Sequence, residues 1–151
     1  MSALDDTDKR LLNRIQSDFP ITSRPFQTIA DDIGLSENEV LDRIGQLKAS
    51  GIIRRIGANF VPAKLGYVST LCAAKVPEHR IEFFAQTVNR YTGVTHHYLR
   101  ENEFNIWFTF IASSMEKIDQ YLNDISRETG ITEILNLPAT NVFKIKAEFG
   151  L

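Results

Sequence analysis

Residues 95–100, with the sequence THHYLR, hold two of the three histidines of the chain beside a tyrosine and an arginine. Side chains alternate between the two faces of a strand, so a strand here places His96, Tyr98 and Arg100 on one face. His97 then lies on the opposite face. Imidazole and phenol groups can transfer protons, and a guanidinium can bind a carboxylate through two parallel hydrogen bonds. The spacing therefore predicts a surface that moves protons and holds anionic groups.

A second strand is expected over residues 104–112, where polar and aromatic residues alternate with phenylalanines. A hairpin loop of two or four residues brings Tyr98 opposite Trp107, and it brings His97 opposite Phe108 on the face that packs against helices. An odd loop length would exchange the two faces, and the sequence leaves that alternative open. With the even loop, one face gathers the following candidate residues: His96, Tyr98, Arg100, Asn105 and Trp107.

The elements that position this hairpin alternate between strand and helix patterns. The expected order is β-α-β-β-α-β, which is typical of the ferredoxin-like fold. Its segments are residues 69–76 (strand), 79–91 (helix), 93–100 and 104–112 (hairpin), 114–129 (helix), and 131–137 with 142–149 (a strand pair or one interrupted strand).

The first half of the chain shows apolar residues at helical spacing in three segments. Pro20 ends the first, and Gly34 ends the second, which covers about residues 25–33. Ser36, with Glu39 three residues on, forms a capping box for the third. Residues 52–60 are short and β-branched, which indicates a strand or wing. We therefore expect an α+β chain: a winged helix-turn-helix (1–60), a linker (61–67) and a ferredoxin-like ligand and dimerisation domain (68–151).

Composition restricts the class of protein. Hydrophobic residues make up 43% and charged residues 24% of the chain, as in globular domains. No apolar run approaches the roughly 20 residues of a membrane helix, and the first ten residues are too polar for a signal peptide. We therefore expect a cytoplasmic protein. A single cysteine, Cys72, excludes an internal disulfide and is expected to be a buried thiol.

The charge balance argues against DNA binding. The net charge is −2, and residues 1–60 carry eight Lys/Arg against nine Asp/Glu. DNA-binding domains usually carry a basic excess that neutralises phosphates. The expected recognition helix carries Glu37, Glu39 and Asp42, which would face phosphates. Arg54 and Arg55 form the main basic group, and they are either ordinary surface charge or a clamp for substrate carboxylates.

A helix-turn-helix followed by a ferredoxin-like domain resembles the Lrp/AsnC regulators. Four segments resemble one branch of that superfamily, the sirohaem (siroheme) decarboxylases: SRPFQTIADDIGLSENEVLDRIGQLKASGIIRRIGANFVPAKLGY, STLCAAKVP, GVTHHYLRENEFNIWFT and LPATNVFKIKAEF. The resemblance covers almost the whole chain. It implies removal of carbon dioxide from two acetate side chains of siroheme, giving 12,18-didecarboxysiroheme for heme or heme d1 formation. It also implies pairing with a paralogous subunit, as a heterodimer, or with a second copy.

A carboxylated iron macrocycle suits the predicted surface. Trp107 and Tyr98 offer an aromatic bed, and His96 can either deliver a proton or coordinate the substrate iron as an axial ligand. The macrocycle itself accepts the electrons of decarboxylation, so no further cofactor is required. We expect catalysis by His96, Tyr98 and Arg100. The expected substrate-binding residues are His97, Asn105, Trp107, Arg54, Arg55, Lys144 and Lys146.

Other interpretations remain open for the chain and for single residues. His97 can instead be a hydrogen-bonded histidine of the packed face, and Lys144 and Lys146 can be solvated edge charges. The chain can be a Lrp/AsnC-type transcription regulator that senses a small ligand or heme. It can also be a subunit that supports a catalytic partner.

Overall fold

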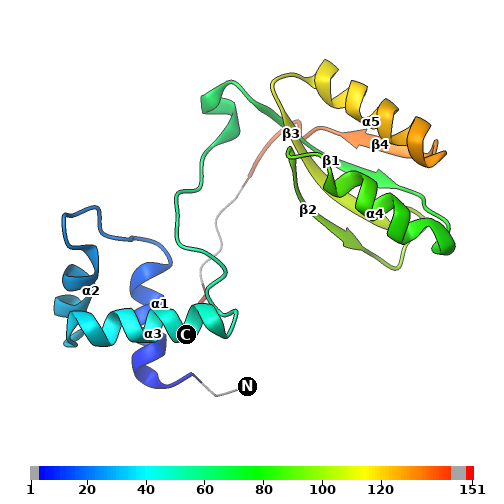
Figure 1. The fold of residues 1–151 in the computed structure, drawn as a ribbon. Helices are drawn as coiled ribbons and strands as arrows, with labels where there is room; N and C mark the ends of the chain where they lie inside the picture. The colour runs from blue at the N-terminus through cyan, green and yellow to red at the C-terminus, as the bar shows by residue number, and fades with distance from the viewer. Residues whose placement is uncertain (1–3, 144–148) are drawn as a thin grey trace. The chain divides into compact units, whose positions relative to one another are not determined.

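The structure is a computed structural model that describes residues 4–143 and 149–151. Lys144 and Lys146 lie outside these residues. The chain divides into two compact units, each with its own hydrophobic core (Figure 1). The N-terminal unit comprises the described residues up to Ala58 together with residues 149–151. The second unit comprises Asn59–Phe143.

In its described residues, the N-terminal unit contains three helices: α1 (Asp6–Ile15), α2 (Pro25–Ile33) and α3 (Glu37–Ala49). Asp5 and Ser36 cap α1 and α3 by accepting hydrogen bonds from backbone N–H groups. Gly34 ends α2 with a φ of 72°, a left-handed conformation that glycine adopts without strain. The predicted helix-turn-helix is therefore confirmed. Its core consists mainly of Leu11, Ile29, Ala30, Val40, Ile44 and Leu47.

Residues 52–60 form no strand, so the predicted wing is wrong. An extended segment is stable as a strand only when its backbone groups pair with a neighbouring strand, and no described segment pairs with this one. Instead, Ile53 N donates a hydrogen bond of 3.0 Å to Leu47 O at the end of α3. Ile53 is also buried in the helical core. Burial of this one side chain holds the segment against the helices as irregular chain.

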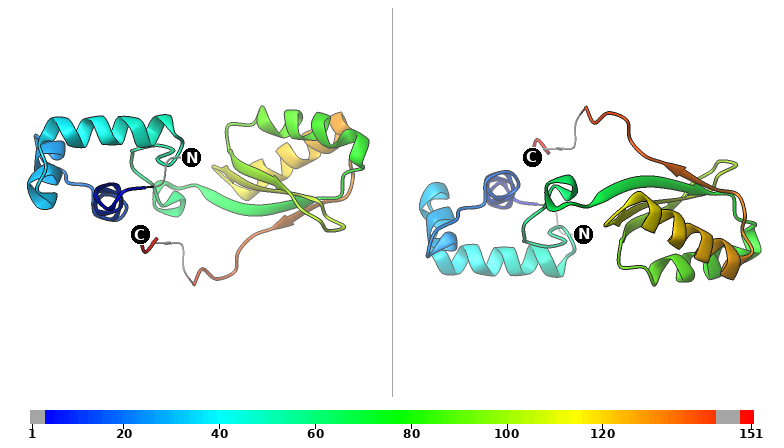
Figure 2. Two further views of the ribbon diagram at one scale, coloured as in Figure 1. Left: turned by 90° about the horizontal axis from the view of Figure 1, so that it is seen from below. Right: turned by 90° about the horizontal axis from the view of Figure 1, so that it is seen from above.

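The second unit contains an antiparallel sheet in the order β2-β3-β1-β4. Its strands are β1 (Val68–Ala74), β2 (Val94–Leu99), β3 (Ile106–Ala112) and β4 (Ile134–Leu137). Helices α4 (Ile81–Asn89) and α5 (Met115–Thr129) cover the same face of the sheet (Figure 2). Two short 3₁₀ helices, η1 (Pro62–Leu65) and η2 (Glu78–Arg80), precede β1 and α4. The ferredoxin-like prediction is confirmed.

Alternation along β3 separates a packed face from an open one. Ile106, Phe108 and Phe110 are buried against α4 and α5, whereas Trp107 and Thr109 are half-buried on the opposite face. We call that opposite face the open face, because none of the described helices of this unit covers it. The open face is the surface on which the predicted functional residues must be sought.

Residues 142, 143 and 149 lie in no strand, and the residues between 143 and 149 are outside the described part. Cys72 is fully buried, and burial raises the pKa of its thiol to about 12. Within the described residues, no helix has both the length and the apolarity needed to cross a membrane.

Candidate functional site

The β2–β3 hairpin has the register that an even loop predicts. Tyr98 lies opposite Trp107, and His97 lies opposite Phe108. Arg100 N donates a hydrogen bond of 2.7 Å to Asn105 O, so the loop consists of the four residues 101–104. The predicted register is confirmed, and it determines which side chains share the open face.

Four of the predicted residues meet on this face. The ring centroids of His96 and Tyr98 are 5.4 Å apart, and the guanidinium carbon of Arg100 lies 5.7 Å from the ring centroid of Trp107. Trp107 Nε1 donates a hydrogen bond of 2.7 Å to Phe104 O, which fixes the indole beneath the guanidinium. Tyr98 is 53% exposed. The result is an accessible aromatic surface with one cation above it.

Both ring nitrogens of His96 have hydroxyl partners. Thr95 Oγ1 lies 2.9 Å from Nδ1, and Thr109 Oγ1 lies 3.0 Å from Nε2. Thr109 faces His96 directly across the strand pair. A register irregularity between Val94 and His96 breaks the regular ladder at Thr95. Such a bulge redirects a side chain locally. In a regular strand Thr95 and His96 would point to opposite faces, whereas here their side chains are in contact.

His97 occupies the other face of β2. Its Nε2 lies 2.9 Å from Asn89 Oδ1, at the end of α4, and its side chain is half-buried. This contact is the hydrogen-bonded arrangement that the sequence left as an alternative for His97. In the described structure, His97 therefore lies apart from His96, Tyr98 and Arg100.

The far end of the hairpin is fastened to the end of β1. Asn105 Nδ2 donates to Val76 O at 2.8 Å, and Val76 N donates to Asn105 Oδ1 at 2.9 Å. Lys75 Nζ lies 2.7 Å from Glu103 Oε1, and this hydrogen bond lowers the pKa of Glu103. The Asn105 amide is thus occupied within the chain. Its described contacts position the base of the loop that carries Arg100.

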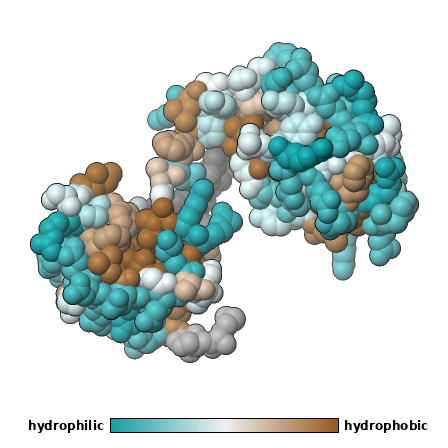
Figure 3. All heavy atoms as spheres, viewed as in Figure 1, coloured by the Kyte–Doolittle hydropathy of each residue, from teal (hydrophilic) through white to brown (hydrophobic). Residues whose placement is uncertain are grey.

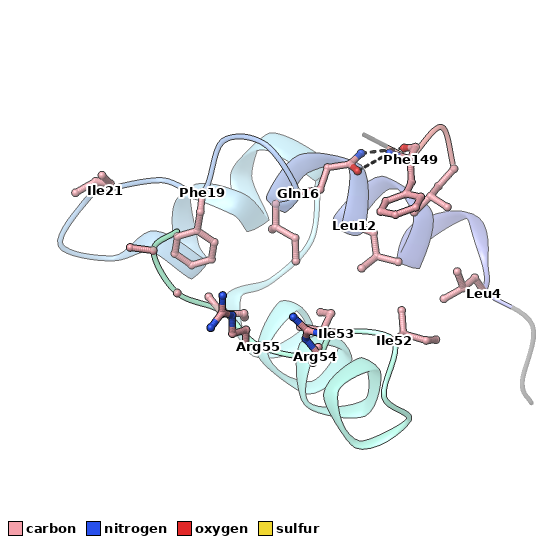
Figure 4. Close-up of a pocket in the computed structure, with 15 residues that line it drawn as sticks. Leu4, Leu12, Gln16, Phe19, Ile21, Ile52, Ile53, Arg54, Arg55 and Phe149 are labelled. Carbon is pink, nitrogen blue, oxygen red and sulfur yellow. Dashed lines mark hydrogen bonds between the residues drawn. The ribbon is translucent and has the colours of Figure 1, made fainter. Parts of the chain in front are cut away.

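Arg54 and Arg55 lie in the N-terminal unit, on the lining of a cavity of about 820 Å³ (Figure 4). The side chains that follow α3 face Leu12 and Phe19 across the cavity. Phe149 lies at one end of it, where Gln16 Nε2 donates a hydrogen bond of 3.0 Å to Phe149 O and Phe149 N donates one of 3.0 Å to Gln16 Oε1. Apolar residues also gather on the visible surface of this unit (Figure 3). The cavity is mainly apolar, with two guanidinium groups on its lining.

The arginines divide into those with internal partners and those without. Arg10, Arg14, Arg24 and Arg43 all bond to carbonyl or carboxylate oxygens. By contrast, Arg54 and Arg55 make no hydrogen bond or ion pair with any residue that the structure describes. Arg100 also has no carboxylate partner in residues 4–143 and 149–151. A guanidinium without an internal anion is available to an external carboxylate.

The described residues contain no cluster of side chains that could bind a metal ion. No group of three or more His, Cys, Asp or Glu side chains there is arranged to hold a metal ion. The side chains of the open face offer proton transfer by imidazole or phenol, together with carboxylate binding by Arg100.

Comparison with known proteins decides the family. The model of the siroheme decarboxylase NirDL-like HTH domain matches residues 8–54, and the AsnC-like ligand binding domain matches residues 64–144. The siroheme decarboxylase alpha subunit of Desulfovibrio desulfuricans is 52% identical over 149 residues, covering 99% of this chain and 86% of that protein. The chain belongs to the siroheme decarboxylase family.

Solved structures agree with this assignment. The siroheme decarboxylase NirDL in co-complex with an iron-uroporphyrin III analogue has a TM-score of 0.68 and 29% identity. That match covers 94% of this chain and 48% of the NirDL chain, so this chain spans about half of that protein. An AsnC family transcriptional regulator from Agrobacterium tumefaciens has a TM-score of 0.79 but only 21% identity, which shows the shared fold alone.

The regulator interpretation is not favoured. The family assignment confirms the resemblance to siroheme decarboxylases. On α3, the side chain of Arg43 is held by Asp5, Asp8 and Glu39 at 2.8, 2.9 and 3.3 Å. Three carboxylates therefore surround Arg43, which lies on the helix that a DNA-binding protein of this fold would place in the major groove.

The residue pattern of the sequence indicates no role for Thr95 or Thr109. The alternation of β3 places Thr109 on the face of Trp107, so the sequence is sufficient to predict which face Thr109 occupies. The same alternation in β2 places Thr95 opposite to His96, and only the bulge brings its hydroxyl to the imidazole. No residue pattern in the sequence identifies that bulge.

Proposed function

We propose that this chain is a siroheme decarboxylase subunit that removes carbon dioxide from two acetate side chains of siroheme. Membership of the family is the observation that carries the proposal. The open face supports it, since this face joins His96 and Tyr98 to a guanidinium that has no carboxylate partner in the described residues. The chain would act as a carboxy-lyase in the cytoplasm.

Each decarboxylation breaks the bond between the acetate methylene carbon and its carboxylate carbon. Carbon dioxide leaves, and the electron pair enters the conjugated macrocycle. A proton is then added to the methylene carbon and yields a methyl group. His96 or Tyr98 delivers this proton, because both are accessible on the open face. The iron belongs to the substrate, and the macrocycle serves as the electron acceptor without an additional cofactor.

Substrate binding requires a flat bed and several cations. We propose that Trp107 and Tyr98 contact the macrocycle and that Arg100 binds a carboxylate bidentately. Arg54 and Arg55 are proposed to bind carboxylates at the cavity of the N-terminal unit, where they lack partners in the described residues. We also propose that Asn105, Lys144 and Lys146 contact the substrate, Asn105 while its amide is bonded to Val76. His97, expected from the sequence as a further contact, is bonded to Asn89 on the other face of β2, and we propose no direct role for it.

We propose that the second unit pairs with a paralogous subunit or a second copy of this chain. The relative from Desulfovibrio desulfuricans is named as an alpha subunit, which favours an assembly of related chains. Leu71, Leu135 and Leu137 on the open face are each about two-fifths exposed. Covering them with another subunit would remove this apolar surface from water.

The test is anaerobic incubation of siroheme with the purified chain, alone and together with any paralogue encoded beside it. Mass spectrometry of the tetrapyrrole should show the loss of two carbon dioxide units. A chain that is active alone contains a competent site, and one that needs the paralogue is a subunit of a heteromeric enzyme. An unchanged tetrapyrrole in both mixtures would refute the proposal.

A further inference from the structure

We propose that Thr95 and Thr109 are positioning residues that hold His96 as a proton donor and keep it from coordinating the substrate iron. The inference rests on the proposed function and deepens it. It decides between the two roles that the sequence leaves open for His96, namely proton donor and axial ligand. It also assigns a role to two threonines on the open face.

The geometry engages both nitrogens of the imidazole. Thr95 Oγ1 lies 2.9 Å from Nδ1 and Thr109 Oγ1 lies 3.0 Å from Nε2, both within ordinary hydrogen-bond distance. Iron coordination needs the lone pair of an unprotonated ring nitrogen. Axial ligation by His96 would therefore require the lasting loss of one of these two bonds.

The two hydroxyls come from different parts of the sheet. Thr109 lies on β3, which is paired on both sides by β1 and β2, so its position is fixed by two ladders. Thr95 reaches Nδ1 because the ladder is irregular between Val94 and His96. Bulges are used to redirect side chains next to functional sites. Here the irregularity supplies the second of the two bonds that orient the ring.

Threonine hydroxyls suit a group that changes its protonation state. A hydroxyl can donate or accept a hydrogen bond, so the pair accommodates either neutral tautomer and also the imidazolium. Delivery of a proton needs only one bond to open during the transfer, while the other keeps the ring in place. The arrangement therefore orients His96 without fixing its charge, as a proton donor requires.

The first experiment needs no substrate. Imidazole ¹⁵N resonances of His96 are compared in the wild-type chain and in Thr95→Val, Thr109→Val and Thr92→Val at one pH. Thr92 is the matched control, since it is an exposed threonine for which the described residues provide no hydrogen-bond partner to its hydroxyl. We expect Thr95→Val to shift Nδ1, Thr109→Val to shift Nε2, and Thr92→Val to shift neither. Unchanged His96 resonances in the first two variants would overturn the proposal.

The second experiment uses the assembled enzyme and iron(III) uroporphyrin III as a probe that carries carboxylates and iron. The wild type and Thr109→Ser should bind it without an imidazole-ligated spectrum. Thr109→Val frees Nε2 and should produce that spectrum, which should disappear in the double variant Thr109→Val/His96→Ala. A wild-type spectrum that is already imidazole-ligated, and that loses this ligation in His96→Ala, would overturn the proposal.

Turnover provides the third measurement. The loss of one orienting hydrogen bond should lower kcat about 3- to 10-fold in Thr95→Val or Thr109→Val, with KM little changed. Serine at either position retains the hydroxyl and should restore kcat, whereas kcat unaffected by both valine variants would contradict the inference. If the wild type itself does not decarboxylate siroheme, the proposed function fails, and the nitrogen resonances still decide whether the threonines hold His96.

Discussion

Replacement of Arg100 by lysine separates substrate binding from stability. The guanidinium has no carboxylate partner in the described residues, and its recorded side-chain contact is the Trp107 ring at 5.7 Å. A lysine retains the charge but loses the planar fork that binds a carboxylate through two hydrogen bonds. Loss of one charge-assisted hydrogen bond typically costs about 1.5–3 kcal/mol. The dissociation constant of a carboxylated tetrapyrrole should therefore rise about 10- to 150-fold.

The effect on folding should be much smaller. A cation over an aromatic ring at an exposed site contributes about 0.5–1 kcal/mol, and lysine retains part of it. The backbone bond from Arg100 N to Asn105 O does not depend on the side chain. Urea denaturation should therefore show a free energy of unfolding within about 1 kcal/mol of the wild type.

The assay can use the fluorescence of Trp107, the single tryptophan of the chain. A tetrapyrrole bound over this ring should quench its emission, so titration with iron uroporphyrin III gives the dissociation constant. Arg80→Lys is the matched control, because Arg80 also lies over an aromatic ring, that of Phe83, at 6.0 Å. It should leave the dissociation constant unchanged. Unchanged affinity in Arg100→Lys, together with a large loss of stability, would show that Arg100 is structural.

Three further predictions concern other parts of the molecule. The hydrogen bond from Arg43 lowers the pKa of Asp5, so Asp5 stabilises the fold at neutral pH, and this contribution is lost as the pH falls through its folded-state pKa. Thermal unfolding from pH 7 to 3 should be less acid-sensitive in Asp5→Asn, and an equal pH dependence would contradict this. Burial raises the pKa of Cys72 to about 12, so the thiol should resist Ellman's reagent at pH 8 until urea unfolds the chain. Rapid reaction of the folded chain would show that the thiol is accessible. Gel-shift titration with the upstream DNA of the gene should give no sequence-selective complex tighter than about 10⁻⁸ M at physiological salt, since carboxylates surround Arg43 on α3.

Periodicity was sufficient to predict the parts of the fold that bury apolar side chains. In β3, alternating phenylalanines bury one face of the strand, which fixes the other face by default. An even hairpin loop then determined that Tyr98 pairs with Trp107. Gly34 and Ser36 marked helix boundaries correctly because their local conformations and hydrogen bonds are governed by the residues themselves.

Features that depend on tertiary partners cannot be predicted from local sequence patterns. The β-branched run after α3 suggested a wing, but no described segment pairs with it. The amide of Asn105 bonds to the backbone of Val76, and no local pattern predicts this contact between residues far apart in the sequence. The irregularity at Thr95 likewise depends on pairing between strands. Sequence alternation therefore predicts which side chains share the open face, but not that the hydroxyl of Thr95 contacts His96.

Turnover of His96→Ala compared with His97→Ala, in the assembled enzyme with siroheme, tests most directly whether the open face performs the decarboxylation. The two histidines are adjacent, but His96 contacts threonines on the open face and His97 contacts Asn89 at the end of α4. His96→Ala should remain folded and lose about 10²- to 10⁴-fold in turnover, as expected for loss of a general acid. His97→Ala should lose stability but retain nearly normal turnover in its folded fraction. Loss of turnover in a stable His97→Ala, with His96→Ala fully active, would contradict the account.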